Sequence, residues 1–277
     1  MAEKNRNGIV VTVFSTASAV GKTLLAVNMT AELARQGYRA CVLDLDLQFG
    51  DVANFLQLNA QYTIFEAQEA VVKRPVSEFQ VMDYLTLYEF DGTEFFVLPA
   101  PQKLEESYNI SAKAVGQVVS ELRHYFDYVI IDTTSAFNEA NLQVMDMSTI
   151  VTAVAIVDFI PTIKNMKIGY DAMKKIGYES NKIRFILNRS NAKTNIEVSD
   201  VEKLMDAQFY HVLPNDFKTA VESTHSGIPI VLDRVNSQTP LGKGLRELVD
   251  KYTNRVGPVK TTPGPQKSSW LSGLFKK

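Results

Sequence analysis

The sequence predicts an α/β fold, a doubly wound and mostly parallel sheet with helices on both faces. Short runs of β-branched and aromatic residues alternate with longer amphipathic segments, as expected for parallel strands joined by crossover helices. Most of these runs are apolar on both faces, which is typical of strands inside a covered sheet. A chain of 277 residues with 45% hydrophobic content can bury one large core. In such a fold ligands bind at the carboxyl ends of the strands.

The elements follow from this alternation. Strands are predicted over residues 8–14, 39–45, 94–100, 127–133, 149–157, 183–188 and 209–214. Helices are predicted over residues 22–36, 111–125, 138–146, 162–176, 198–206, 216–225 and 239–252. The run "LTLYEFDGTEFFVLP" breaks the alternation, because Asp91-Gly92 is a hairpin signal. It predicts an antiparallel strand at the edge of the sheet.

The end of the chain differs in composition from the rest. We expect one domain over residues 1–252, a flexible linker rich in Pro, Gly, Thr and Ser over 253–267, and a short amphipathic segment over 268–277. In "SSWLSGLFKK" the apolar residues fall on one helical face. Docking on an anionic membrane and docking on a protein partner both remain open for this tail. The residues concerned are Trp270, Leu271, Leu274, Phe275, Lys276 and Lys277.

Composition excludes several classes of protein. The net charge of -2 shows no excess of basic residues of the kind that binds nucleic acid, so we do not expect nucleic acid as a partner. The single cysteine, Cys41, excludes an internal disulfide, and the three histidines have no zinc-ligand spacing with it. The start "MAEKNRNG" does not resemble a signal peptide, and no run approaches the roughly 20 apolar residues of a membrane span. We therefore expect a cytoplasmic protein with peripheral membrane contact at most.

The stretch "FSTASAVGKTLL" follows a predicted strand and opens a predicted helix. Its Gly21-Lys22-Thr23 ends like a phosphate-binding loop, in which backbone N–H groups and a lysine bind phosphate and a hydroxyl ligates magnesium. The first glycine of the G-x-x-x-x-G-K-[ST] pattern is replaced by Thr16. An ordinary strand-to-helix turn is the structural alternative.

Three aspartates favour the phosphate-binding interpretation. Asp44 and Asp46 lie at the end of the second predicted strand, and in the run "YVIIDT" Asp132 follows four consecutive apolar residues. Carboxylates at this edge could hold a metal ion and orient water for phosphoryl transfer. Singly, each could be a helix cap or turn residue.

Taken together, these motifs resemble the ParA/MinD-type ATPases, the deviant Walker group of phosphate-loop proteins. The likeness covers residues 8–250, through "GKT", "DLDLQFGDVANFL", "DYVIIDT", "ILNRSN" and "VLPND". Within that group the chain is similar to the CpaE/TadZ proteins of tight-adherence pilus systems, above all in "DLDLQFGDVANFLQL". Those proteins usually carry a receiver-like domain ahead of this one, which we do not expect here because the first strand begins at about residue 8.

The resemblance implies ATP and Mg²⁺ as cofactors and assigns roles to residues. Lys22 would contact the β and γ phosphates, Asp46 would position the attacking water, and both are implied in catalysis. The metal would be held through Thr23, Asp44 and Asp132. The implied nucleotide-binding residues are Ala17, Ser18, Ala19, Val20, Gly21, Lys22, Thr23, Leu24, Asn188, Arg189, Pro214, Asn215 and Asp216.

One departure from the family pattern bears on activity. MinD-type proteins carry a signature lysine that reaches the nucleotide of the partner subunit, and Ala17 stands at that position. Loss of a cation that stabilises transition-state charge predicts slow hydrolysis, because such a group contributes on the order of 10³-fold or more. ATP binding depends on the backbone and Lys22, so we expect it to survive.

Three functions follow as hypotheses. The first is an ATP-dependent homodimer of the CpaE/TadZ kind that recruits pilus or secretion machinery to a membrane site. The second is an active MinD/ParA-type ATPase that cycles on a membrane or nucleoid. The third is a pseudo-ATPase that acts as a structural module. Ala17 argues against fast turnover, the apolar tail favours membranes over DNA, and retention of Asp46 argues against the purely structural hypothesis.

Overall fold

The computed structural model describes residues 7–73, 79–158, 160–190 and 196–254. Its strands are β1 (Ile9–Phe14), β2 (Ala40–Leu45), β3 (Thr86–Phe90), β4 (Thr93–Leu98), β5 (Tyr128–Thr133), β6 (Ile150–Ala155), β7 (Ile183–Leu187) and β8 (Phe209–Val212). Its α-helices are α1 (Lys22–Arg35), α2 (Val52–Phe55), α3 (Ile64–Lys73), α4 (Leu104–Ser107), α5 (Ala112–Tyr125), α6 (Glu139–Met147), α7 (Ile160–Lys175), α8 (Val198–Met205), α9 (Phe217–Ser226) and α10 (Pro240–Tyr252).

In the described residues the strands form one sheet in the order β3-β4-β2-β5-β1-β6-β7-β8. All neighbouring pairs are parallel except β3 and β4, which confirms the predicted α/β fold and its antiparallel edge strand. The turn between β3 and β4 places Asp91 at φ 46° and Gly92 at φ 77°. Two positive φ values in sequence match the strand twist of a hairpin, which is why Asp-Gly signalled it.

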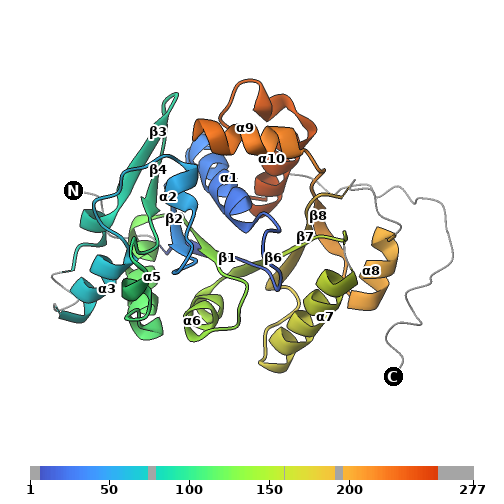
Figure 1. Ribbon diagram of the computed structural model, residues 1–277, viewed down its shortest axis with the longest axis horizontal. Coiled ribbons are helices and arrows are strands. Elements are labelled where there is room, and N and C mark those ends of the chain that lie inside the picture. Colours follow the sequence, from blue (N-terminus) through green and yellow to red (C-terminus); the bar gives the residue numbers. More distant parts are fainter. Residues whose placement is uncertain (1–6, 74–78, 159, 191–195, 255–277) are drawn as a thin grey trace.

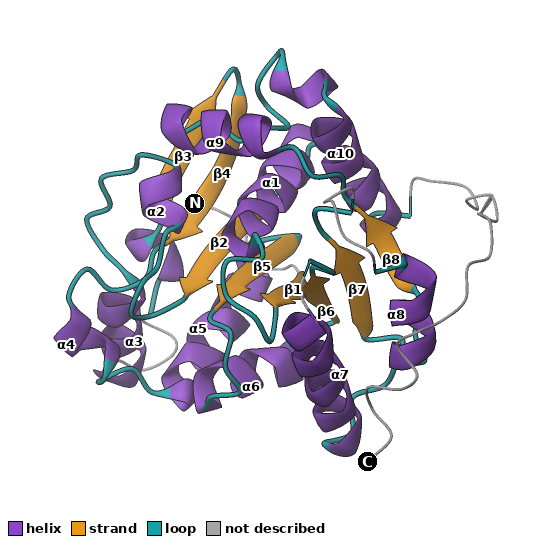
Figure 2. Cartoon of the chain, turned by 45° about the vertical axis from the view of Figure 1, so that its right-hand side comes forward, coloured by secondary structure: helices purple, strands orange, loops and turns teal. Residues whose placement is uncertain are grey.

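Helices cover both faces of the sheet, as Figure 1 shows, with α1, α9 and α10 on one side and α3, α5, α6, α7 and α8 on the other. Figure 2 shows the same layers from a second direction. Alternate residues of β1 serve the two faces: Val11 and Val13 join the cluster under α1, and Val10 joins the cluster under α5. A third cluster lies under α7 and α8.

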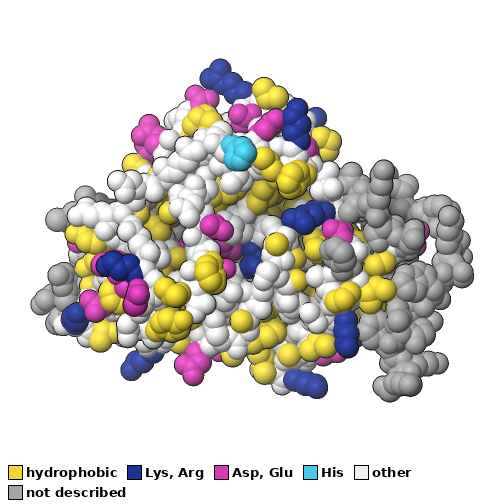
Figure 3. All heavy atoms as spheres, in the orientation of Figure 1, with side chains coloured by type: hydrophobic (Ala, Val, Ile, Leu, Met, Phe, Trp, Pro, Cys, Tyr) yellow, Lys and Arg dark blue, Asp and Glu magenta, His cyan; other side chains and the backbone are white. Residues whose placement is uncertain are grey.

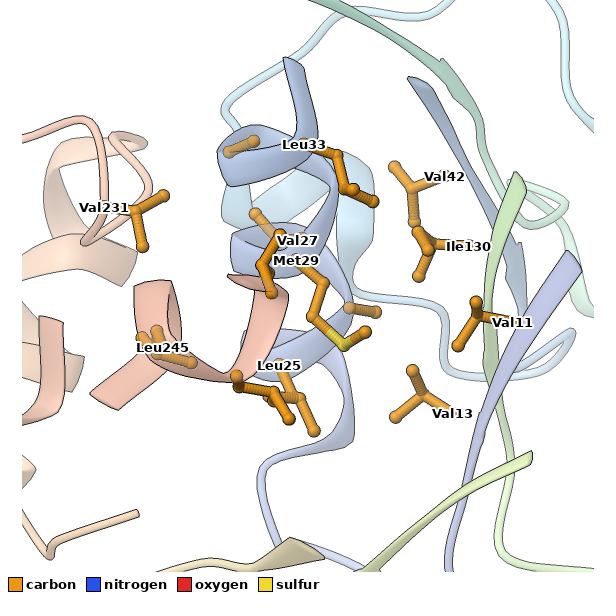
Figure 4. Close-up of a cluster of buried hydrophobic side chains, with 14 of the residues drawn as sticks. Val11, Val13, Leu25, Val27, Met29, Leu33, Val42, Ile130, Val231 and Leu245 are labelled. Carbon is orange, nitrogen blue, oxygen red and sulfur yellow. The ribbon is translucent and has the colours of Figure 1, made fainter. Parts of the chain in front are cut away.

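Helix α1 is the most enclosed helix of this arrangement. Figure 4 shows its Leu25, Val27 and Met29 between strand residues on one side and α10 on the other. It is buried along most of its length, because α10 covers the flank that the sheet leaves open. Its amino end is thereby fixed at the carboxyl edge of β1, where the phosphate-loop motif lies.

The segment between β2 and β3 differs from the prediction. It contains α2, α3 and a 3-10 turn over Val81–Tyr84, and α4 follows β4, although none of these was predicted. Helices α2 and α4 and the 3-10 turn have four residues each, so an apolar period covers too few residues to stand out. Helix α3 has ten residues, as many as the predicted α9, and the sequence prediction missed it. Strand β8 ends at Val212 rather than at Pro214, since proline has no N–H to continue a ladder.

The predictions for the linker and the apolar tail fall on residues 255–277, which lie outside the described residues. Within the part of the chain that is described, no helix is both long enough and apolar enough to cross a membrane.

Candidate functional site

The loop between β1 and α1 is shaped around Gly21. This residue has a φ of +95°, and a Cβ added there would lie 2.6 Å from Nδ2 of Asn188. Both the conformation and the close approach require glycine. Helix α1 begins at the next residue, Lys22, so its positive end lies directly behind the loop. Such a helix start is a favourable place for a phosphate group.

The two residues after Gly21 contact β5 and the loop that follows it. Lys22 is 9% exposed, and its ammonium donates a hydrogen bond to Oγ of Ser135 at 2.9 Å. The Thr23 hydroxyl donates to Oδ2 of Asp132 at 2.6 Å. The structure thus brings together the lysine, the hydroxyl and the carboxylate that the sequence motif predicts.

The glycine-poor half of the loop is held by the residues after β7. Ala19 adopts a left-handed φ of 57°, and its carbonyl accepts a hydrogen bond from Arg189 at 2.9 Å. The carbonyl of Val20 accepts one from Asn188 Nδ2 at 2.9 Å. Ser18 is exposed. Asn188 and Arg189, which the resemblance implies as nucleotide-binding residues, therefore also hold the phosphate loop in place.

Two of the aspartates lie side by side in the sheet. Asp44 of β2 and Asp132 of β5 are register partners, and each is 1% exposed. The Asp44 oxygens accept the backbone N–H groups of Asp46 and Val52, both at 3.0 Å. Among the described residues, Oδ1 of Asp132 has no hydrogen-bond partner. A buried carboxylate oxygen without a partner is costly unless a cation binds it.

Burial dominates the electrostatics of these carboxyl groups. It raises the pKa of Asp132 to about 7, against the opposing effects of the Thr23 hydroxyl and the Lys22 charge. Burial, together with the Asp132 charge, raises the pKa of Asp44 well above its usual range. Asp46 is half-buried, and desolvation raises its pKa while Lys22 opposes the shift. The group therefore favours either protons or a bound cation.

The donor atoms fit magnesium rather than a softer metal. A hydroxyl on Thr23 and a free oxygen on Asp132 are hard ligands of the kind that Mg²⁺ prefers. In the described parts of the chain no group of three or more His, Cys, Asp or Glu side chains could hold a metal alone. Magnesium commonly completes its shell with water and substrate phosphates, so two protein ligands beside a phosphate loop suffice.

A cavity of about 270 Å³ adjoins the same loop. Seven residues implied by the sequence line it: Gly21, Leu24, Asn188, Arg189, Pro214, Asn215 and Asp216. Six further residues from α9 and α10 were not predicted: Phe217, Ala220, Val221, Thr224, His225 and Leu241. The amphipathic pattern of residues 216–225 predicted a helix. It did not indicate which face of that helix would line a cavity.

Asp216, which lines this cavity, is the N-cap residue of α9. Its carboxylate caps α9, accepting hydrogen bonds from N–H and Oγ1 of Thr219 at 3.1 and 2.7 Å. The residue thereby fixes the start of the helix that forms one wall.

Comparisons with known proteins identify the family of this domain. Residues 11–230 match the model of the CobQ/CobB/MinD/ParA nucleotide binding domain. The chain is 23% identical over 266 residues to the septum site-determining protein MinD of Thermotoga maritima, covering 91% of this chain and 90% of the relative. It is 28% identical over 275 residues to an iron-sulfur cluster carrier protein of Pyrococcus horikoshii, covering 92% and 89%.

Solved structures show the same fold. A ParA family ATPase from Chlorobium tepidum superposes with a TM-score of 0.77 at 18% identity, covering 87% of this chain and 97% of that one. MinD of Pyrococcus horikoshii complexed with Mg-ADP gives 0.74 at 19% identity, covering 88% and 96%. The MinC:MinD complex of Aquifex aeolicus gives 0.76 at 19% identity, covering 92% and 100%. Since the family model matches most of its length, the chain belongs to the CobQ/CobB/MinD/ParA family of nucleotide-binding domains.

Proposed function

We propose that this protein binds MgATP at the carboxyl edge of its sheet and acts as a slow ATPase of the MinD/ParA type. One observation carries the proposal. Gly21 and Leu24 line the cavity, while Lys22 and Thr23, between them in sequence, contact the loop and strand around Asp132. A base in the cavity would therefore have its phosphates over the loop and beside the carboxylates.

The chain's own residues would divide the chemistry among them. Lys22 would bind the phosphates, and Thr23 with Asp132 would hold Mg²⁺, which neutralises charge on the phosphates when bound. Asp44 accepts two backbone N–H groups and would hold its neighbour Asp46 in place. Asp46 is only half-buried and has a raised pKa, so it can orient a water molecule for attack.

Slow turnover is part of the proposal. Ala17 carries a methyl group where the resemblance implies a cation, so its side chain offers nothing to transition-state charge. Arg189 is near the loop, but it donates a hydrogen bond to the carbonyl of Ala19. One of its guanidinium nitrogens is thus engaged in holding the loop.

Face-to-face association with a second copy is the second element of the proposal. Four large apolar side chains stand exposed on segments that follow the carboxyl ends of β2, β4 and β5. This apolar rim consists of Phe49 (76% exposed), Leu104 (49%), Tyr108 (71%) and Phe137 (38%). Figure 3 shows hydrophobic side chains on this face around a few acidic and basic ones at its centre. Exposed apolar groups around a site favour an interface that encloses it.

A narrower candidate is a localisation factor for pilus assembly. It is supported by the run "DLDLQFGDVANFLQL" and the loop without its lysine, which resemble CpaE/TadZ proteins. The relatives named above are MinD proteins and an iron-sulfur cluster carrier, so they favour the broader MinD/ParA proposal. Membrane docking through Trp270 to Lys277 belongs to both candidates as a proposal.

We do not propose that this protein carries iron-sulfur clusters. Iron-sulfur clusters are held by several thiolates, and the sequence offers one cysteine. Cys41 is 1% exposed in β2, and burial raises its pKa well above the usual range. A buried protonated thiol does not serve as a ligand.

Light scattering tests binding and association together. In Asp46→Asn, which should retain nucleotide, we expect the molar mass to double on addition of MgATP. Phe49→Glu should bind MgATP but remain a monomer, because a charge would replace an apolar contact. Ile176→Glu is the matched control, because it changes an exposed apolar residue that directly follows the last residue of α7. A mass that never changes with MgATP rejects the dimer, and an equal response of both variants rejects the apolar rim.

A further inference from the structure

Ser135 lies in the loop between β5 and α6, and no motif drew attention to it. Its hydroxyl accepts a hydrogen bond from the Lys22 ammonium at 2.9 Å and donates one to the carbonyl of Ala17 at 2.7 Å. A serine hydroxyl has a single proton to donate. With that proton committed to Ala17, the oxygen lone pairs are directed at Lys22.

The peptide units around Ala17 are thereby held from both sides. The N–H of Ala17 donates to Oγ of Ser15 at 3.1 Å, and its carbonyl accepts from Ser135. Ser15 is 4% exposed, so its hydroxyl is part of the packed structure. Two serine hydroxyls therefore fix the stretch of the loop that has side chains where related loops have glycines and a lysine.

Lys22 is the other end of this connection. It is 9% exposed, and among the described residues no salt bridge reaches it. A lysine side chain has several rotatable bonds, and ordering it costs conformational entropy. The contact with Ser135 supplies that order before any ligand binds. An ammonium has three N–H groups, so this contact leaves two for phosphate oxygens.

We propose that Ser135 is a positioning residue that holds the Lys22 ammonium ready for the nucleotide phosphates and links it to the backbone of the lysine-less half of the loop. The proposal rests on the proposed function and deepens it. Its ligand is the phosphate chain of an adenine nucleotide. Ser135 acts through Lys22 and Ala17 rather than by reading the base.

Calorimetric titration with MgADP and with MgATP tests this role. Ser135→Ala should weaken both affinities by roughly tenfold, since it removes a hydrogen bond to a charged group. Ser135→Thr keeps a hydroxyl and should restore most of the loss. Ser15→Ala touches the loop but not Lys22, so it should lose less. Ser180→Ala, at the amino edge of β7, is the remote control and should match the wild type.

Two further measurements separate positioning from a merely structural role. The thermal midpoint of the nucleotide-free protein should be the same in Ser135→Ala and Ser180→Ala. Ser135 is half-buried, so in Ser135→Ala the Lys22 ammonium and the Ala17 carbonyl can each hydrogen-bond to solvent without being held in place. Inorganic pyrophosphate, which has no base, should lose the same factor in affinity as MgADP.

The results that overturn the proposal are distinct from failure of the proposed function. If the wild type binds no MgADP, the function itself is rejected. If the wild type binds and Ser135→Ala binds equally well or more tightly, Ser135 does not position Lys22. The positioning role is also rejected if Ser135→Thr is no better than Ser135→Ala, or if the thermal midpoint falls in Ser135→Ala.

Discussion

The two sides of the phosphate loop differ in how complete they are. On one side, α9, α10 and the loop after β7 form a cavity whose polar wall residues are already hydrogen-bonded, as with Asn188 to Val20 and Asp216 to Thr219. On the other side, Asp132 is buried with one carboxylate oxygen unpartnered beside a second buried carboxyl, Asp44. The cavity, which we call the base side, is therefore formed without a ligand. The Asp132 and Asp44 carboxyls, which we call the metal side, need a bound cation to offset the free-energy cost of their burial.

The largest expected effect comes from the residue between the two sides. Lys22→Ala should weaken MgATP binding by roughly 100-fold or more, because it removes a charged donor from the phosphates. The thermal midpoint should stay close to that of the wild type. Calorimetry measures the affinity, and an unchanged dissociation constant rejects the phosphate site altogether.

Asp46→Asn should separate binding from turnover. The amide cannot accept a proton or orient water as a carboxylate does, so hydrolysis should fall by about 10²-fold or more while MgATP affinity stays within a few-fold. Phosphate release under single-turnover conditions measures it. Equal rates in variant and wild type show that Asp46 takes no part in hydrolysis.

Ala220→Trp tests the base side alone. The indole would fill part of the cavity of about 270 Å³, and we expect a loss of about tenfold or more in MgATP affinity without loss of pyrophosphate binding. Lys218→Trp, on an exposed position of the same helix, is the control. Undiminished affinity in Ala220→Trp places the base elsewhere.

On the metal side we expect a smaller effect, a dependence of folding stability on pH. Because the folded-state pKa of Asp132 is raised to about 7, the folded protein holds a proton there that the unfolded chain releases near its ordinary pKa. Asp132 therefore contributes stability at low pH that is lost as the pH rises from about 4 through about 7. The buried imidazole of His211, whose pKa is lowered to about 4 by burial, acts in the opposite direction over the same range. The thermal midpoint of the nucleotide-free protein is therefore compared with that of a variant that lacks the Asp132 carboxyl.

Asp132→Asn is that variant, and from about pH 4 to about pH 7 the midpoint of the wild type should fall relative to that of the variant. MgADP should remove this Asp132-dependent fall from the wild type, since a bound cation keeps the carboxylate ionised. A wild-type midpoint that rises relative to that of Asp132→Asn through this window contradicts the assignment of an unneutralised buried carboxylate.

The sheet and the ends of its strands could be predicted from the sequence, because buried parallel strands consist of continuous apolar runs. Sequence reasoning also located Asp44 and Asp132, since carboxylates after such runs are unusual. It did not reach Ser135, because a serine after a strand is too common to stand out. The cavity-lining face of α9 was equally hidden, because its residues meet Gly21 and Leu24 only through the packing of α9 and α10 around α1.

The central claim is that a preformed base cavity and a cation-dependent carboxylate side form one nucleotide site. Calorimetric titration of the full chain with ATP, with and without Mg²⁺, tests it most directly. We predict one binding site in both titrations, with clearly tighter binding when Mg²⁺ is present and no gain from Mg²⁺ in Asp132→Asn. Absence of binding, or equal affinity of the wild type with and without Mg²⁺, would contradict the claim.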